Sequence, residues 1–281
     1  MDISMLIFVF LWGVVVGSVF SSIGAAGGIL TSFGLISLFG VRDPNMVKPM
    51  TQIVVLATAL IFVPGYFRRK AVVWPLGVLL GLGGLAGAWL GSTLSSVWLS
   101  DMRAFKPWFG GLTLLVAAKI VFDFLGRSRL PAAQQDFGIS RGVSALQAGL
   151  TKLSFNYSVY HYDIPYWQPL LAGFVISMVA AIFGVGGGFL LVPFMLGMLR
   201  MPMHIIPATA AIAIFMSLIV SIGNYLHLGA SIDWSLLIPL LPGAIIGAVF
   251  GQVLNRNMKN AWLQIALGII VFGIGLKYLL A

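Results

Sequence analysis

The chain has 281 residues, of which 60% are hydrophobic and 8% are charged, and its mean hydropathy is +1.05. This composition excludes a soluble domain of comparable size and indicates a polytopic membrane protein. The absence of cysteine excludes disulfides and thiolate metal sites, and a net charge of +9 on such a chain points to lipid headgroups rather than nucleic acid.

The first apolar stretch, residues 5–39, has no charged residue but is interrupted by glycines at Gly24, Gly27 and Gly28. A single helix of this length would measure about 52 Å, which exceeds the hydrocarbon core of about 30 Å. Each glycine also weakens a helix by about 1 kcal/mol relative to alanine. We therefore expect two shorter helices that meet at the glycines.

Uninterrupted apolar spans are expected next at residues 47–67, 74–97 and 109–125. The middle span is rich in glycine, which predicts close packing against other helices. Arg42, Asp43, Pro44 and Lys48 are expected to belong to a polar loop before the first of these spans.

Residues 127–168 differ from the rest because they are rich in basic and aromatic residues and lack a long apolar run. Within them, residues 141–155 are expected to form a short amphipathic helix on the membrane surface. We interpret 127–168 as a linker between two membrane repeats, residues 1–126 and 169–281.

The second repeat follows the order of the first. A stretch broken by glycine at residues 169–199 precedes spans at 206–226, 232–254 and 261–280. Matching positions in the two halves are Gly13 and Gly173, Gly27-Gly28 and Gly187-Gly188, Thr51 and Thr209, Gly87 and Gly247, Gly91 and Gly251, and Lys119 and Lys277. These correspondences predict an internal duplication.

The charge distribution favours one topology. If each glycine-broken stretch enters and leaves on the same side, most basic loop residues fall on the side of the linker. The positive-inside rule then places the linker in the cytoplasm and both termini outside. We therefore expect an all-α polytopic membrane protein with two inverted repeats, each a glycine-broken hairpin plus three transmembrane helices, which is a transporter arrangement.

The two breaks are the predicted substrate site. An opened helix in a membrane must face protein or a water-filled cavity, and a helix that restarts there presents free N–H groups and a positive dipole end to an anion. The candidate residues are the glycines Gly24, Gly27, Gly28, Gly184, Gly186, Gly187 and Gly188 and the polar neighbours Ser22, Thr51, Gln52, Thr209 and Asn224. The alternative is that the glycines and hydroxyls serve only helix packing.

Other functions have weaker support. The segment with Met195, Met198, Met201, Met203 and His204 offers soft ligands for a Cu(I) transporter, although methionine is a common filler of apolar helices. The third possible function is that of a structural membrane protein that transports nothing. The chain has no Gly-Xaa-Ser-Xaa-Gly or His-Glu-Xaa-Xaa-His motif, so we expect neither an enzyme nor a bound cofactor.

The second glycine motif and the start of the next span together resemble the TauE/SafE family of membrane permeases. The residues that carry the resemblance are Gly184-Val185-Gly186-Gly187-Gly188, Pro193 and Pro207-Ala208-Thr209. The first copy departs from the pattern at Ala25-Ala26 and Phe33. The resemblance implies a multi-pass protein of the inner (plasma) membrane that moves small sulfur-containing anions such as sulfite, sulfonates, sulfoacetate or thiosulfate, often outward. The expected partners are this anion and the bilayer, and a homodimer is compatible with the sequence.

Overall fold

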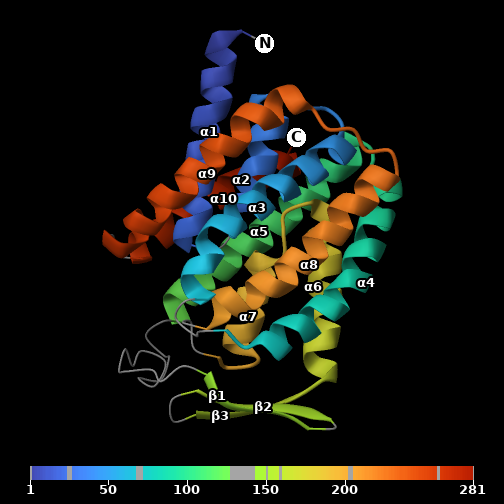
Figure 1. The fold of residues 1–281 in the computed structure, drawn as a ribbon. Helices are drawn as coiled ribbons and strands as arrows, with labels where there is room; N and C mark the ends of the chain where they lie inside the picture. Colours follow the sequence, from blue (N-terminus) through green and yellow to red (C-terminus); the bar gives the residue numbers. More distant parts are fainter. Residues whose placement is uncertain are drawn as a thin grey trace.

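The computed structural model describes residues 2–23, 27–67, 72–126, 143–149, 151–157, 160–201, 205–257 and 260–280, and most of them are helical (Figure 1). The helices before the linker are α1 (Ile3–Ile23), α2 (Gly27–Phe33), the π-helix η1 (Gly34–Leu38), α3 (Pro44–Phe67), α4 (Trp74–Trp98) and α5 (Met102–Gly126). Those after it are α6 (Trp167–Phe183), α7 (Gly188–Gly197), α8 (Ile206–His227), α9 (Trp234–Asn257) and α10 (Asn260–Leu280).

Within the described residues, five helices are long and apolar enough to cross a membrane. Their spans are Ile3–Ser22, Trp74–Trp98, Met102–Phe122, Thr209–His227 and Trp234–Gly251. Shorter apolar helices flank the two glycine breaks. The prediction of a polytopic membrane protein is therefore confirmed.

The linker contains a sheet, so the all-α class needs correction. Strands β1 (Val143–Ala148), β2 (Lys152–Tyr157) and β3 (Tyr160–Pro165) form an antiparallel sheet in the order β1-β2-β3. The amphipathic helix predicted over 141–155 is therefore wrong where the structure describes these residues. In β2, Leu153 and Phe155 are buried while Ser154 and Asn156 are not, and this alternation with a period of two is typical of a strand.

The buried face of the sheet covers the helix ends near α7 and α8. Leu153, Phe155 and Ile164 belong to one apolar cluster with Met201 and Ile205, which lie between these two helices. The Tyr162 hydroxyl also donates to the Arg200 carbonyl at 3.4 Å. The sheet is thus fixed to the end of the bundle at which α7 ends and α8 begins.

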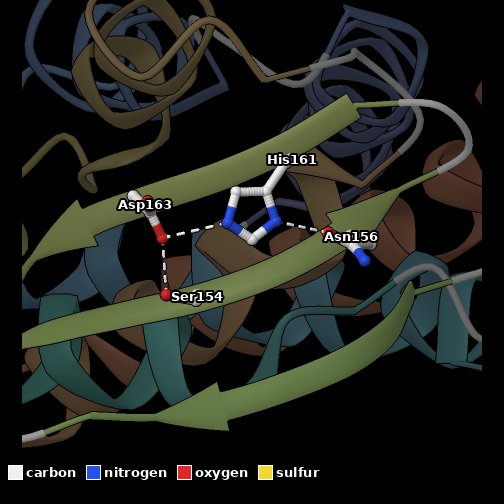
Figure 2. A network of polar contacts seen from close by, with 4 residues as sticks. All are labelled: Ser154, Asn156, His161 and Asp163. Atoms are coloured by element: carbon white, nitrogen blue, oxygen red, sulfur yellow. Dashed lines mark hydrogen bonds and ion pairs between the residues drawn. The ribbon is translucent and has the colours of Figure 1, made fainter.

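The opposite face of the sheet carries a polar network across β2 and β3 (Figure 2). The His161 ring lies between Asn156 and Asp163, 3.2 Å from the Asp163 carboxylate. Ser154 donates a hydrogen bond to the same carboxylate and is the main reason that the pKa of Asp163 lies below its ordinary value. Because Ser154 contacts the carboxylate and not the imidazole, the group links the strands and does not form a nucleophilic triad.

Both glycine-broken stretches return to the end of the bundle from which they start. Met5 near the start of α1 lines the same pocket as residues 39–43, which follow η1, and the rings of Phe8 and Phe39 lie 5.7 Å apart. In the second stretch, α6 follows β3 directly, and Arg200, just after α7, contacts β3 again. Both chain ends lie away from the sheet (Figure 1).

The helices of the two halves pack reciprocally. Helix α1 packs along α9 and α6 packs along α4, while α5 packs along α10. A Cβ atom added to Gly87 would overlap the Phe174 carbonyl, and one added to Gly247 would overlap the Val14 carbonyl. Close helix packing at these glycines is what the sequence predicts, and only a residue without a side chain permits it.

The loop before α3 is shorter than expected. Helix α3 begins at Pro44, and the Asp43 carboxylate accepts the Asn45 N–H at 2.8 Å, as an N-cap does. Proline suits the first helical position because its missing N–H would have no acceptor there. Lys48 therefore lies inside α3 and not in the loop to which the sequence analysis assigned it.

Candidate functional site

The second glycine break is a turn between two helices. Gly184 ends α6 with a φ of 71° and Gly186 has a φ of 77°. Both values lie in the left-handed region, which glycine adopts at little cost. The Val185 N–H closes the turn by donating to the Ala180 carbonyl at 3.2 Å.

Helix α7 restarts at Gly188 without a side-chain cap in the described structure. The N-cap residue is Gly187, so there is no side chain at that position to satisfy the first N–H groups of the helix. The Leu190 N–H donates to the Gly187 carbonyl at 3.2 Å, whereas the N–H groups of Gly188 and Phe189 precede the first acceptor of the helix and coincide with its positive dipole end. Gly187, Gly188 and Phe189 are all buried, so the open helix start faces the interior.

The two breaks contact each other. Gly28 in α2 lies against the second break, where an added Cβ would overlap the Val185 carbonyl and come within 2.6 Å of the Val185 Cα. Gly27 lies beside it against the Phe20 ring. The structure thus brings together the predicted glycines of both repeats, except Gly24, which is outside the described residues.

Helix α3 lines the second break with one face. Gly184 lies against the Lys48 stem, with an added Cβ 2.6 Å from the Lys48 Cα, and Gly186 lies against Val55. Gln52 occupies the same face of α3 between these residues, because positions four and seven apart share a helix face. Gln52 therefore belongs to the face of α3 that contacts the broken backbone.

Gln52 has an unused polar atom. The side chain is fully buried, its Nε2 donates to Ser221 of α8 at 2.8 Å, and its Oε1 has no partner among the described residues. A buried polar atom left unpaired costs about 1–3 kcal/mol. If the amide rotates by half a turn, Oε1 accepts from Ser221 and the NH₂ group becomes a free donor in the interior.

The other predicted polar residues are bonded within the protein. Thr51 lies 3.1 Å from the Ser32 hydroxyl of α2. Thr209 accepts the Val73 N–H at 3.0 Å and so fixes the start of α4 to α8. Asn224 bonds Ser92 of α4 at 2.7 Å, and Ser22 bonds the Gly251 carbonyl of α9 at 2.9 Å. These contacts are those of helix packing.

The sequence analysis missed Lys48 as part of the site. Its side chain is fully buried, and its ammonium donates to Asn45 Oδ1 and to the Ser95 and Leu99 carbonyls at 2.8–3.1 Å. An aspartate N-cap followed by proline predicts a helix start at residue 44. That signal could have placed Lys48 inside the helix.

The described methionines of the predicted Cu(I) segment differ in burial. Met195 and Met201 are fully buried in the apolar cluster near the sheet, whereas Met198 is 64% exposed. Met203 and His204 lie outside the described residues. The described methionines are thus divided between the core and the surface, as expected of residues that fill space.

Comparison with known proteins places the chain among membrane transporters. Residues 9–278 match the family model described as "Sulfite exporter TauE/SafE". The probable membrane transporter protein YunE of Bacillus subtilis (strain 168) is 26% identical over 270 residues, covering 94% of this chain and 93% of that protein. A probable membrane transporter protein of Xylella fastidiosa (strain 9a5c) is 25% identical over 266 residues, covering 94% and 91%.

No solved structure matches the chain. The family match spans both glycine breaks and all the helices that surround them, and it confirms the resemblance seen in the glycine motif. The chain therefore belongs to the TauE/SafE sulfite exporter family of membrane transporters.

Proposed function

We propose that this protein is a secondary transporter that exports small sulfur-containing anions, such as sulfite, sulfonates, sulfoacetate or thiosulfate, across the inner (plasma) membrane. Export of sulfite is supported by the family description, and the other anions by the resemblance given in the sequence analysis. The structural observation that supports an anion site is the buried start of α7, which has no side-chain cap and follows the turn where the two breaks meet. The unpaired amide oxygen of Gln52, on the face of α3 that contacts this turn, supports it further.

The chemistry of this region suits an anion. The first N–H groups of a helix bind negative charge without a salt bridge. The described aspartates, in contrast, lie near helix ends, at the N-terminus or on the sheet. Because glycine lacks a side chain, a small ligand can approach the backbone closely.

The two membrane halves, 1–126 and 169–281, act in this proposal as inverted repeats. The reciprocal packing of α1 on α9 and α6 on α4 supports it, as does the return of each broken stretch to its own side. Transport then proceeds by movement of the two halves around a site fixed at the breaks, as in other inverted-repeat transporters.

Single cysteines test the proposed topology. Ser100 and Thr151 are exposed, Ser100 after α4 and Thr151 at the start of β2 on the sheet side. With the sheet in the cytoplasm, Thr151→Cys should react with an impermeant thiol reagent only from the cytoplasmic side. Ser100→Cys should react only from outside. Labelling of both from one side would contradict the inverted arrangement, and labelling of each from the opposite side to the one predicted would contradict the cytoplasmic position of the sheet.

Flux measurements test the transported species. Purified protein in proteoliposomes should carry labelled sulfite or sulfoacetate faster than protein-free liposomes, while chloride and Cu(I) serve as comparison ions. Flux of Cu(I) without flux of either sulfur anion would favour the methionine-based alternative. Flux of none of these ions would show that the proposed substrate class is wrong.

A further inference from the structure

A buried cation, the Lys48 side chain, lies at the second break. Lys48 is fully buried in α3, and Gly184 packs on its stem. Three oxygens surround its Nζ: Asn45 Oδ1 at 3.1 Å, the Ser95 carbonyl at 3.1 Å and the Leu99 carbonyl at 2.8 Å. Three acceptors at these distances match the three N–H donors of an ammonium.

The ammonium has no ion-pair partner among the described residues. The Asp43 carboxylate acts on Lys48 electrostatically from beyond ion-pair distance, but Asp43 is exposed, so water screens its charge. Its acceptors include the last carbonyls of α4, which carry only partial negative charge, and the rings of Phe105 and Tyr225 lie 5.3 and 5.8 Å from Nζ. The region therefore keeps a net positive charge. An ionisable side chain in this position is costly and indicates function.

The same cluster holds the end of α6 at the break. The Ser95 hydroxyl donates to the Ile182 carbonyl at 2.6 Å, and the Tyr225 hydroxyl donates to the Ala181 carbonyl at 2.8 Å. Both Ser95 and Tyr225 also contact the Lys48 ammonium. The residues that contact the ammonium thus also bind the backbone that leads into the proposed anion site.

We propose that Lys48 gives the site at the second break its net positive charge and so sets its preference for anions of higher charge. The inference rests on the proposed function. Lys48 does not need to touch the ligand, because its field acts across the break. From the level of Lys48 to that of Val55, which faces Gly186, α3 rises about 10 Å. The ammonium reaches back to Asn45, so its distance from Val55 is at least that large. At about 10 Å and an effective dielectric constant near 20, one charge changes affinity by at most roughly tenfold.

Two sulfonates of different charge separate this role from a structural one. Methanesulfonate carries one negative charge and sulfoacetate carries two. In calorimetric titrations at neutral pH, Lys48→Met should weaken methanesulfonate binding by up to about tenfold and sulfoacetate binding by the square of the same factor, up to about a hundredfold. Lys48→Arg, which keeps the charge, should restore the ratio of the two affinities. Damage to the fold would instead weaken both anions equally.

Ser95→Ala is the matched control, because it removes the bond to Ile182 in the same cluster but changes no charge. The ratio of its affinities for sulfoacetate and methanesulfonate should equal that of the parent protein. If Lys48→Met is not monodisperse, Lys48→Gln replaces it, since the amide can still donate to the α4 carbonyls. Equal losses for both anions, or no loss, would overturn the inference. A parent protein that binds neither sulfonate would instead refute the proposed function.

Discussion

Gly28→Ala is expected to abolish anion binding and to destabilise the protein. The added methyl group would overlap the Val185 carbonyl, and both partners are backbone, so neither can move aside cheaply. Overpacking of this kind costs about 1–3 kcal/mol or more. The two breaks must then separate, which displaces the turn at Val185 and the start of α7 that follows it. Thermal unfolding and anion titration of the purified variant measure the two effects.

Gly247→Ala provides the control for this loss of binding. Its methyl group would overlap the Val14 carbonyl as severely, but at the contact between α1 and α9, away from the second break. It should lower the melting temperature by a similar amount while the folded protein still binds the anion. If both variants keep their affinity, the contact between the breaks is not part of the site.

Gln52→Leu is expected to weaken anion binding about ten- to a hundredfold. That range corresponds to one lost hydrogen bond to a charged ligand, about 1.5–3 kcal/mol. Stability should change little, because the variant removes an unpaired buried atom along with the bond to Ser221. Titration with sulfoacetate, with thermal unfolding recorded in parallel, measures both quantities.

Thr209→Val is the matched control for Gln52→Leu. Its hydroxyl bonds the Val73 N–H and the Ile205 carbonyl, so its loss leaves a buried N–H unpaired. We expect a loss of about 1–3 kcal/mol in stability and little change in affinity. A result in which Thr209→Val loses affinity and Gln52→Leu does not would reverse the roles assigned to these two residues.

The sequence predicts the helix contacts well where glycine makes them. Helices can approach this closely only at residues without side chains, so the spacing of Gly87 and Gly91, repeated at Gly247 and Gly251, marks the packed faces in advance. The left-handed turn at Gly184 and Gly186 follows from the same property.

Side-chain partners could not be predicted in the same way. Thr51 and Thr209 occupy matching positions, yet one contacts Ser32 and the other the start of α4, because each meets different helices from elsewhere in the chain. Lys48 was missed because its charge suggested a loop, whereas its partners are carbonyls of α4, about fifty positions away. The sheet was missed because a helical period was assigned where Leu153 and Phe155 alternate with polar residues.

The most direct test of the central claim is to locate the bound anion. Crystals of the protein grown with bromomethanesulfonate would show the bromine by its anomalous scattering. We predict a single strong peak beside the start of α7, with the sulfonate within hydrogen-bond distance of the first N–H groups of that helix and of Gln52. A peak at another place in the bundle, with the region between Gly28 and Gly187 unchanged, would contradict the proposed site.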